Sequence, residues 1–318
     1  MAGLFYTLYT NEVTSLHELL HTQYYTTLTK HSRIKFNDTV HVTINFVDDS
    51  SNIIGFKSFE TIKDYLQNYY RLLQNYYNIN KLLINPDKNQ VMICAKPKYQ
   101  QDVTNFSFKA SQYTIKNKSS IKILGIQVNH DLNIDNHLNY VTSKCYNVVH
   151  NIKKVTKYTD QESRLRFINA HVLGKLGYML PILSSANIRQ INKVHKLVMF
   201  SARTIIGNYC FKKSINYILG KIKWMTAKNM INWSVIKTIH KILYYQDPSN
   251  LAKFYKTNKR FSANITVVNC PKNGKSRNFY MYKGLDLYNK LPVEYRKLKP
   301  ETFKTKALKY FKSNLQVH

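Results

Sequence analysis

Two adjacent carboxylates, Asp48 and Asp49, follow an apolar stretch in the segment NFVDDSS at residues 45–51. Asp and Ser are ordinary turn residues, so the pair has a purely structural interpretation as a turn. Two hard oxygen ligands at the end of a strand also suit Mg²⁺, which binds carboxylates. The choice between a turn and a metal site depends on the elements that surround the pair.

The charge of the chain is extreme, because 48 Lys and Arg stand against 17 Asp and Glu and give a net charge of +31. A cation of this size favours a polyanionic partner, and nucleic acid leads that class. An acidic membrane surface is the alternative, but no clear basic amphipathic helix or apolar run of about 18 residues supports it. Compositional drift can enrich Lys, but it does not explain the scarcity of acids.

The four cysteines, Cys94, Cys145, Cys210 and Cys270, are scattered without a C-x-x-C pair. Their spacing argues against a zinc ribbon or a disulfide framework and favours a reducing compartment. The first residues, MAGLFYTLYTNEV, lack the basic and apolar regions of a signal peptide. We therefore expect an intracellular protein, in the nucleus or the cytoplasm.

The first part of the chain, residues 1–135, is predicted as an α+β domain. In HVTINFVDDSSNIIGF, apolar and polar residues alternate around the acidic turn, which predicts a β-hairpin with Asp48 near its tip. A helix with Ser58 as N-cap should follow, and another is expected over residues 4–29. KLLINPDKNQVMICA predicts a strand, a turn and a second strand, and IKILGIQVNHDLNI predicts a further strand and turn ending near Asp131.

The pattern changes to helices over residues 136–247. A stripe of apolar residues at helical spacing begins at Leu138. The sequence TDQE predicts a capping box, with Thr159 as N-cap and Glu162 reaching back to it. A third helix is expected over residues 187–206, and KNMINWSVIKTIHKILYY predicts a fourth.

The last part, residues 248–318, contains the basic loop CPKNGKSRN and a closing amphipathic helix in FKTKALKYFKSNL. Basic stretches such as HNIKKVTK and KTNKR each have a bland interpretation as solvated faces. Aromatic side chains beside lysines also make a sequence-tolerant nucleic-acid surface. The histidines are spread over the helices without metal-ligand spacing, so packing or surface roles are expected for them.

Several segments together resemble the C-terminal part of a non-LTR (LINE-type) retrotransposon reverse transcriptase. NFVDDSS resembles the aspartate-pair hairpin of the polymerase palm, and LLINPDKNQVM resembles the palm segment that leads through Asn and Pro to a lysine. The Leu-Gly strand before the thumb resembles IKILGIQVNHDLNIDNHL. A thumb-region helix of the family resembles LPILSSANIRQINKVHKLVMFSARTIIG. GLFYTLYTNEV resembles the end of the segment after a Gln-Gly motif, and LYNKLPVEYRKLKPETFKTKALKYF the C-terminal tail. The resemblance covers nearly the whole chain and rests on the order of these segments, because an Asp-Asp pair alone is a weak motif.

The resemblance implies an α+β fold in three parts. Residues 1–135 would be a partial palm, a sheet with packed helices. Residues 136–247 would be a mostly α-helical thumb, and residues 248–318 a basic loop with a C-terminal helical tail.

The resemblance also implies a two-metal polymerase site. Asp48 would bind Mg²⁺ (or Mn²⁺) from the hairpin, and Asp49 would support it or bind peripherally. Lys88 matches the palm lysine that steadies or protonates the leaving phosphate. The family's other bridging carboxylate lies before the Gln-Gly segment, and neither Asp38 nor Asp64 stands in its place. We therefore expect a truncated enzyme that is inactive by itself.

The implied activity is RNA-directed DNA polymerase, a nucleotidyltransferase reaction. Its partners would be an RNA template with a DNA primer, or an RNA–DNA hybrid, together with deoxynucleotide triphosphates and no membrane. A separate chain could supply the N-terminal palm and fingers, which would make this protein a complementing subunit. The alternative is a non-catalytic nucleic-acid-binding protein derived from a retroelement.

Overall fold

The computed structural model describes residues 40–46, 49–55, 60–95, 99–207, 213–247, 249–252, 255–258, 265–268 and 280–314. The chain divides into two compact units, Met1–Ile134 and Asp135–His318. The predicted helix over residues 4–29 and the loop CPKNGKSRN lie outside the described residues.

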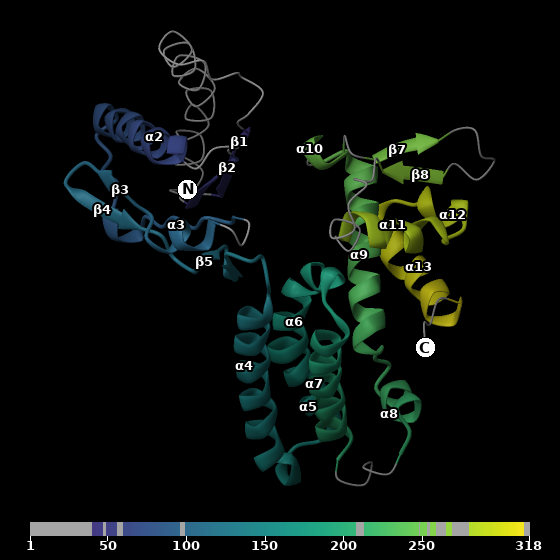
Figure 1. The fold of residues 1–318 in the computed structure, drawn as a ribbon. Helices are drawn as coiled ribbons and strands as arrows, with labels where there is room; N and C mark the ends of the chain where they lie inside the picture. The colour runs from purple at the N-terminus through teal and green to yellow at the C-terminus, as the bar shows by residue number, and fades with distance from the viewer. Residues whose placement is uncertain are drawn as a thin grey trace. The chain divides into compact units, whose positions relative to one another are not determined.

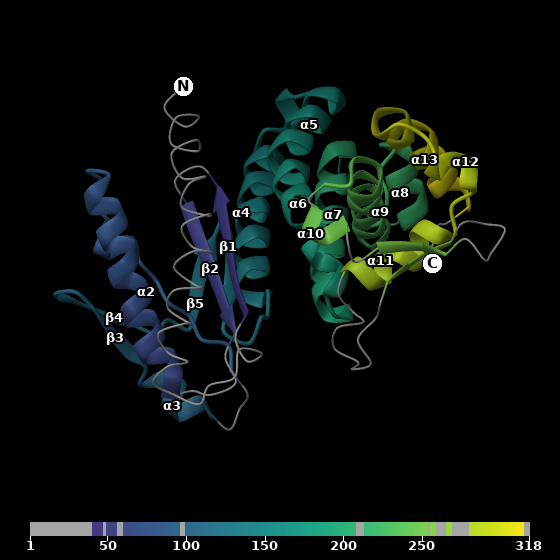
Figure 2. The same cartoon turned by 90° about the horizontal axis from the view of Figure 1, so that it is seen from above.

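The predicted hairpin around the two aspartates is confirmed. Strand β1 (Val40–Phe46) pairs antiparallel with β2 (Asp49–Gly55), and the two strands lie side by side in Figure 2. Phe46 is opposite Asp49 at the end of the ladder. Asp48 stands between these paired residues in the sequence and lies outside the described residues.

Helix α2 (Glu60–Ile79) covers a second hairpin, formed by β3 (Ser107–Ala110) and β4 (Tyr113–Lys116). Its residues Ile62, Leu66 and Tyr70 pack against a small core of four side chains, Phe106, Phe108, Ala110 and Ile115. The Tyr69 hydroxyl instead donates a hydrogen bond to Asn52 Oδ1 of β2 at 3.0 Å. The predicted helix is confirmed, although Ser58 lies outside the described residues.

The predicted strand, turn and strand in KLLINPDKNQVMICA is wrong. Asn85 caps a short 3₁₀ turn, η2 (Pro86–Lys88), by accepting a hydrogen bond from the Asp87 amide at 3.0 Å. This side-chain cap competes with a strand for the backbone. Leu83 is 91% exposed, and beyond it Val91 makes only an isolated bridge to Asn117. The segment therefore has a turn but no pair of strands.

The predicted strand near residue 123 is part of a tight hairpin. After the short helix α3 (Gln100–Thr104), β5 (Ser120–Ile123) pairs with β6 (Ile126–Asn129). The two linking residues, Leu124 and Gly125, have φ values of 46° and 85°. Positive φ at both positions is the signature of a type I′ turn, whose twist matches the strands on either side.

The described strands form four separate two-stranded antiparallel ladders rather than one continuous sheet. The fourth ladder, β7 (Tyr255–Asn258) with β8 (Ile265–Val268), belongs to the second unit. Most described residues outside the ladders are helical. The α+β class predicted from the sequence is therefore confirmed.

The second unit consists mostly of packed helices (Figure 1). Its first half contains α4 (Asp135–Lys154), η4 (Thr156–Tyr158), α5 (Gln161–Ile168), a π-helical turn η5 (Asn169–Leu173), α6 (Gly174–Met179) and η6 (Ile182–Ser185). It continues with α7 (Ile188–Ile206), α8 (Ile215–Lys221), α9 (Ala227–Tyr245), α10 (Ser249–Ala252), α11 (Tyr280–Asn289), α12 (Val293–Arg296) and α13 (Pro300–Asn314).

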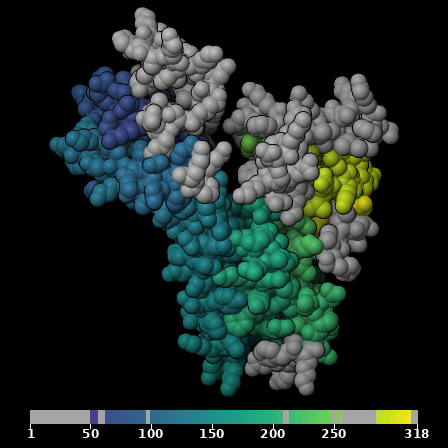
Figure 3. Space-filling view, viewed as in Figure 1, coloured from purple at the N-terminus to yellow at the C-terminus, as the bar shows by residue number. Residues whose placement is uncertain are grey.

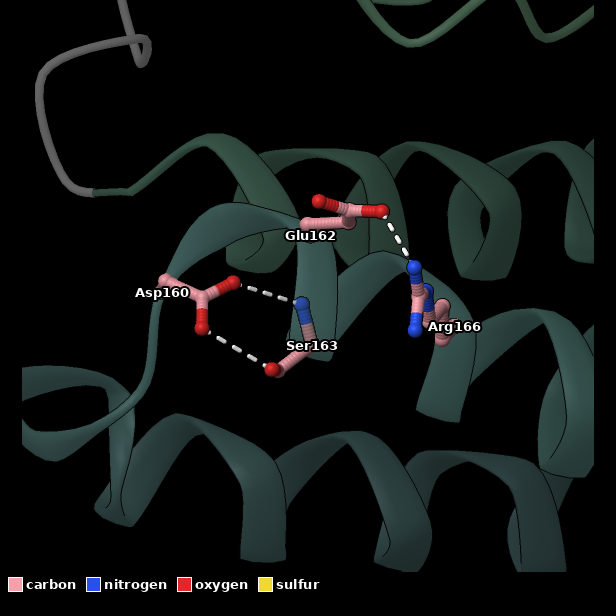
Figure 4. A network of polar contacts seen from close by, with 4 residues as sticks. All are labelled: Asp160, Glu162, Ser163 and Arg166. Atoms are coloured by element: carbon pink, nitrogen blue, oxygen red, sulfur yellow. Dashed lines mark hydrogen bonds and ion pairs between the residues drawn. The ribbon is translucent and has the colours of Figure 1, made fainter.

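The caps of these helices follow their sequences, with one correction. Thr159 is not the N-cap of α5, because its hydroxyl donates to the Val155 carbonyl at 3.1 Å. Asp160 is the N-cap and accepts hydrogen bonds from the Ser163 amide at 2.7 Å and the Ser163 hydroxyl at 2.9 Å (Figure 4). These bonds to the ionised carboxylate lower the pKa of Asp160. The predicted end of α7 at residue 206 is confirmed, and its C-cap is Gly207, where φ is 102°.

Helices α9, α11 and α13 share one core, although the sequence assigned them to two different segments. Trp233 of α9 stacks on Phe303 of α13, and Leu285 and Tyr288 of α11 belong to the same cluster. His240 is satisfied inside it, with Nδ1 3.1 Å from the Tyr288 hydroxyl and Nε2 3.0 Å from the Leu298 carbonyl. Burial lowers the pKa of His240 and raises the pKa of Tyr288 to about 12, so both groups are neutral near pH 7. The packing role expected for this histidine is confirmed.

Candidate nucleic-acid interface

Of the three residues predicted for catalysis, the structure describes Asp49 and Lys88. Asp49 is the first residue of β2, Lys88 is the last residue of η2, and Asp48 lies outside the described residues. Lys88 is exposed, and its ammonium group makes no hydrogen bond or ion pair with any described residue. Within the described ranges, no group of three or more His, Cys, Asp or Glu side chains is placed to hold a metal ion. The described residues therefore do not assemble a complete metal site.

The second unit has a charge distribution of a different kind. Between Glu162 and Asp247 the sequence contains no acidic residue, and every charged side chain in this interval is Lys or Arg. The interval runs from the first turn of α5 to the residue after the C-cap of α9. Four of its helices, α6 to α9, therefore carry basic groups without a carboxylate of their own. Uncompensated charge of this extent is expected where a polyanion supplies the counter-charge.

Helix α7 carries this charge on the side that meets α4. Lys193, Lys196 and Phe200 are spaced by three and four residues, so they lie along one face of the helix. Burial and the charge of Arg203 lower the pKa of His195, which lies next to this row. The lowered pKa keeps His195 neutral near pH 7 and leaves Lys193 and Lys196 as the charged groups of the row.

Helices α4 and α7 lie side by side and run in the same direction. Near their starts, Gln190 donates a hydrogen bond to Asp135 Oδ1 at 2.7 Å, and the Lys193 ammonium donates to Asn139 Oδ1. Further along, the His150 ring centroid lies 5.0 Å from that of Phe200. Residues later in α4 thus contact residues later in α7, as expected for parallel helices. They fix the lateral position of α7 against α4 over several turns.

These contacts form a surface in which rings and ammonium groups alternate. Tyr146 lies 5.7 Å from Phe200 between ring centroids, and the Lys153 ammonium stands 5.8 Å above the Phe200 ring. We call this surface the α4–α7 seam. It consists of Asn139, Tyr146, His150 and Lys153 of α4 with Lys193, Lys196 and Phe200 of α7.

Much of the seam is exposed, and no carboxylate among the described residues pairs with its exposed lysines. Lys153, Lys196 and His150 are exposed, and the Tyr146 and Phe200 rings are half-buried. Neither Lys153 nor Lys196 is paired with a carboxylate in the described structure. The packed side chains of α4 to α7 form the teal part of the surface in Figure 3. Ammonium groups of this kind bind phosphates, and half-exposed rings stack on bases without regard to sequence.

The sequence contained a signal for this surface that its motifs did not show. Segments such as HNIKKVTK are basic but common, so each of them can be a solvated face. The interval from residue 163 to 246 is stronger, because the absence of carboxylates persists over several helices. The pairing of α4 with α7 could not be predicted in the same way, since it depends on tertiary contacts between residues far apart in the chain.

Comparison with known proteins does not place the chain in a family. A scan against models of protein families, a search of curated proteins and a search of solved structures each found no match. None of the helices in the described ranges has the length and apolar character needed to cross a membrane.

Proposed function

We propose that this protein binds nucleic acid through the α4–α7 seam, as a derivative of a non-LTR retroelement reverse transcriptase. The observation that carries the proposal is the interval between Glu162 and Asp247, which has no carboxylate and whose helix α7 lines the seam. The net charge of +31 over the whole chain points in the same direction.

The chemistry of the seam favours contacts with the backbone over recognition of a sequence. Lysine is a compact point charge that neutralises phosphates without fixed geometry. Tyr146 and Phe200 offer ring faces, and every base has a face that can stack on them. Sequence-tolerant binding with a strong dependence on salt is the behaviour that follows.

Removing seam lysines should weaken binding in a defined way. In the double substitution Lys153→Gln and Lys196→Gln, we expect affinity for a short single-stranded DNA to fall by about tenfold at low salt. The slope of log K against log salt should become shallower by about 0.7 for each lysine that contacts a phosphate of the single strand. Fluorescence anisotropy across a salt series measures both quantities.

A matched control removes the same charge elsewhere. Lys109 and Lys116 are exposed on the hairpin β3–β4 of the first unit, so Lys109→Gln with Lys116→Gln changes the net charge equally. We expect this control to lose less than half as much affinity, in logarithmic terms. Equal losses in the two double variants would show that bulk charge, and not the seam, binds the DNA.

A second candidate function is RNA-directed DNA synthesis with Mg²⁺ or Mn²⁺ and deoxynucleotide triphosphates. The hairpin β1–β2 favours it, because Asp49 stands at the end of that ladder and Asp48 precedes it in the sequence. In this candidate Asp48 and Asp49 bind the metal ion, Lys88 assists the leaving phosphate, and an RNA template with a DNA primer is bound. The two aspartates suit Mg²⁺ because both are hard oxygen ligands.

Primer extension on poly(rA)·oligo(dT) separates the two candidates. Synthesis that is lost in Asp48→Ala and kept in Asp64→Ala, an exposed aspartate of α2, is the result expected of a polymerase. The same assay with an added N-terminal palm and fingers chain tests the role of a complementing subunit. No synthesis in either format, or synthesis unchanged by Asp48→Ala, leaves nucleic-acid binding as the function.

A further inference from the structure

A second group of three lysines lies outside the α4–α7 seam, on helices α9 and α13. Lys237 and Lys241 are one turn apart on α9, and Lys304 lies on α13. Lys237 is half-buried, whereas Lys241 and Lys304 are exposed. Residues four apart on a helix are neighbours on its surface, so the two α9 ammonium groups share one side of that helix.

The packing of α13 against α9 brings Lys304 to the same height along α9 as Lys237 and Lys241. The Phe303 ring stacks on the His240 ring with centroids 3.7 Å apart, and His240 lies between the two α9 lysines in the sequence. The Tyr245 hydroxyl donates to Glu301 Oε1 at 3.3 Å, while Trp233 contacts Phe311. These contacts make α9 and α13 antiparallel. They hold the residue after Phe303 beside the turn that carries Lys237 and Lys241.

Among the described residues, no carboxylate compensates the charge of this cluster. None of the three ammonium groups is paired with a carboxylate in the described part of the unit. The acidic side chain nearest in the sequence of α13, Glu301, accepts the hydrogen bond from Tyr245. Burial, then the charges of Lys304 and Lys241, lower the pKa of Lys237. Three like charges held together by rigid packing are costly, and an anion removes that cost.

We infer that Lys237, Lys241 and Lys304 form a binding site for the phosphate groups of a polyanion. Phosphate oxygens accept charge-assisted hydrogen bonds, and an ammonium group supplies three donors without fixed direction. The aromatic core beneath the lysines holds both helices in place before a ligand arrives, so little ordering accompanies binding. The phosphates can come from a nucleic-acid backbone or from a free polyphosphate, and both sources share this chemistry.

The site is independent of the α4–α7 seam and goes beyond the proposed function. It uses none of the seam residues and lies on α9 and α13. The DNA-binding experiment on the seam therefore does not decide whether this site exists, and the site requires a separate probe. Inorganic tripolyphosphate is suitable, because it has no bases and cannot stack on the rings of the seam.

The experiment titrates the full chain with tripolyphosphate by isothermal titration calorimetry. We expect Lys237→Gln with Lys304→Gln to lower the affinity by about tenfold, the loss of one to two charge-assisted hydrogen bonds. Lys306→Gln, an exposed lysine also on α13, is the matched control and should change the affinity by less than about twofold. Lys304→Arg keeps the charge and should retain most of the binding. Lys241→Gln, at an exposed position, tests the site again without touching the half-buried lysine.

Each outcome decides the proposal. Loss of tripolyphosphate affinity in the double variant and in Lys241→Gln, with Lys306→Gln unaffected, supports the site. A parallel titration with single-stranded DNA then identifies the source of the phosphates. A loss of affinity for both probes indicates a nucleic-acid backbone. A loss of affinity for tripolyphosphate alone indicates a free polyphosphate. No binding of tripolyphosphate by the unmodified chain, or equal losses in the Lys306→Gln control, overturns it.

Discussion

Replacement of Gly284 by alanine is expected to destabilise the protein by about 2–3 kcal/mol. A Cβ atom at this position in α11 would lie 2.0 Å from Val235 Cγ1 and 2.8 Å from Ile239 Cδ1 of α9. Both neighbours are almost fully buried in the shared core, so neither can move aside without displacing others. The absence of a side chain at Gly284 is therefore what lets α11 approach α9 closely.

Chemical denaturation monitored by circular dichroism measures the change in the free energy of unfolding. Gly177→Ala in α6 is the matched control, because an added Cβ there meets nothing within 4 Å. That substitution should be neutral or stabilising by up to about 1 kcal/mol, since alanine favours the helix over glycine. Adding Val235→Ala to Gly284→Ala should cost less than the sum of the single changes, because it clears space for the new methyl group. Equal effects of the two glycine substitutions would contradict a close approach of the helices.

The elements that the sequence predicted well are those whose signals are local. Helix α7 has its N-cap in Asn187, its capping-box partner in Gln190 and its stop in Gly207, so its bounds follow from residues close in the chain. Helix α4 shows the limit of this approach. The apolar stripe predicted from Leu138 onward is buried at Leu138 and Cys145, but Thr142 also takes a place on the buried face because its hydroxyl donates to the Leu138 carbonyl at 2.7 Å. A satisfied polar side chain does not appear in an apolar pattern.

One predicted pair of strands was wrong, because a short apolar pattern does not show whether a partner strand exists. Leu82 and Leu83 suggested a strand, yet no strand among the described residues pairs with them, and the chain enters the turn at Asn85. The candidate site shows the same difference between features visible in the sequence and features that depend on tertiary contacts. The scarcity of acids was visible in the composition, whereas the contact between His150 and Phe200 exists only because α4 and α7 run side by side. Charge can be read from the sequence, but the surface that presents it depends on packing.

The second large effect is expected at Arg164, whose substitution by methionine should cost about 3 kcal/mol or more. Its side chain is buried on α5 and donates hydrogen bonds to three carbonyls, those of Ile205 and Thr156 at 3.0 Å each and that of Thr159. The Ile205 carbonyl belongs to the last turn of α7, where carbonyls lack partners within the helix and the helix dipole favours a positive charge. Methionine would preserve much of the volume but leave these carbonyls unsatisfied.

Arg166, two residues further along α5, is the matched control. It is exposed and pairs with Glu162 one turn earlier at 2.6 Å (Figure 4). Solvent screens such a pair, so Arg166→Ala should change the free energy of unfolding by no more than about 0.5 kcal/mol. Denaturant titrations of both variants compare a buried and an exposed arginine on the same helix.

Arg164→Lys distinguishes the shape of the side chain from its charge. Lysine keeps the positive charge near the end of α7, but a single ammonium group cannot reach carbonyls that the guanidinium spans from several nitrogens. We therefore expect Arg164→Lys to recover only part of the stability lost in Arg164→Met. Full recovery would mean that charge alone holds α5 against α7, and no loss in either variant would refute the three-carbonyl contact. Helix α7 forms one side of the α4–α7 seam. Loss of the Arg164 contact should therefore also weaken DNA binding, although every seam lysine is kept.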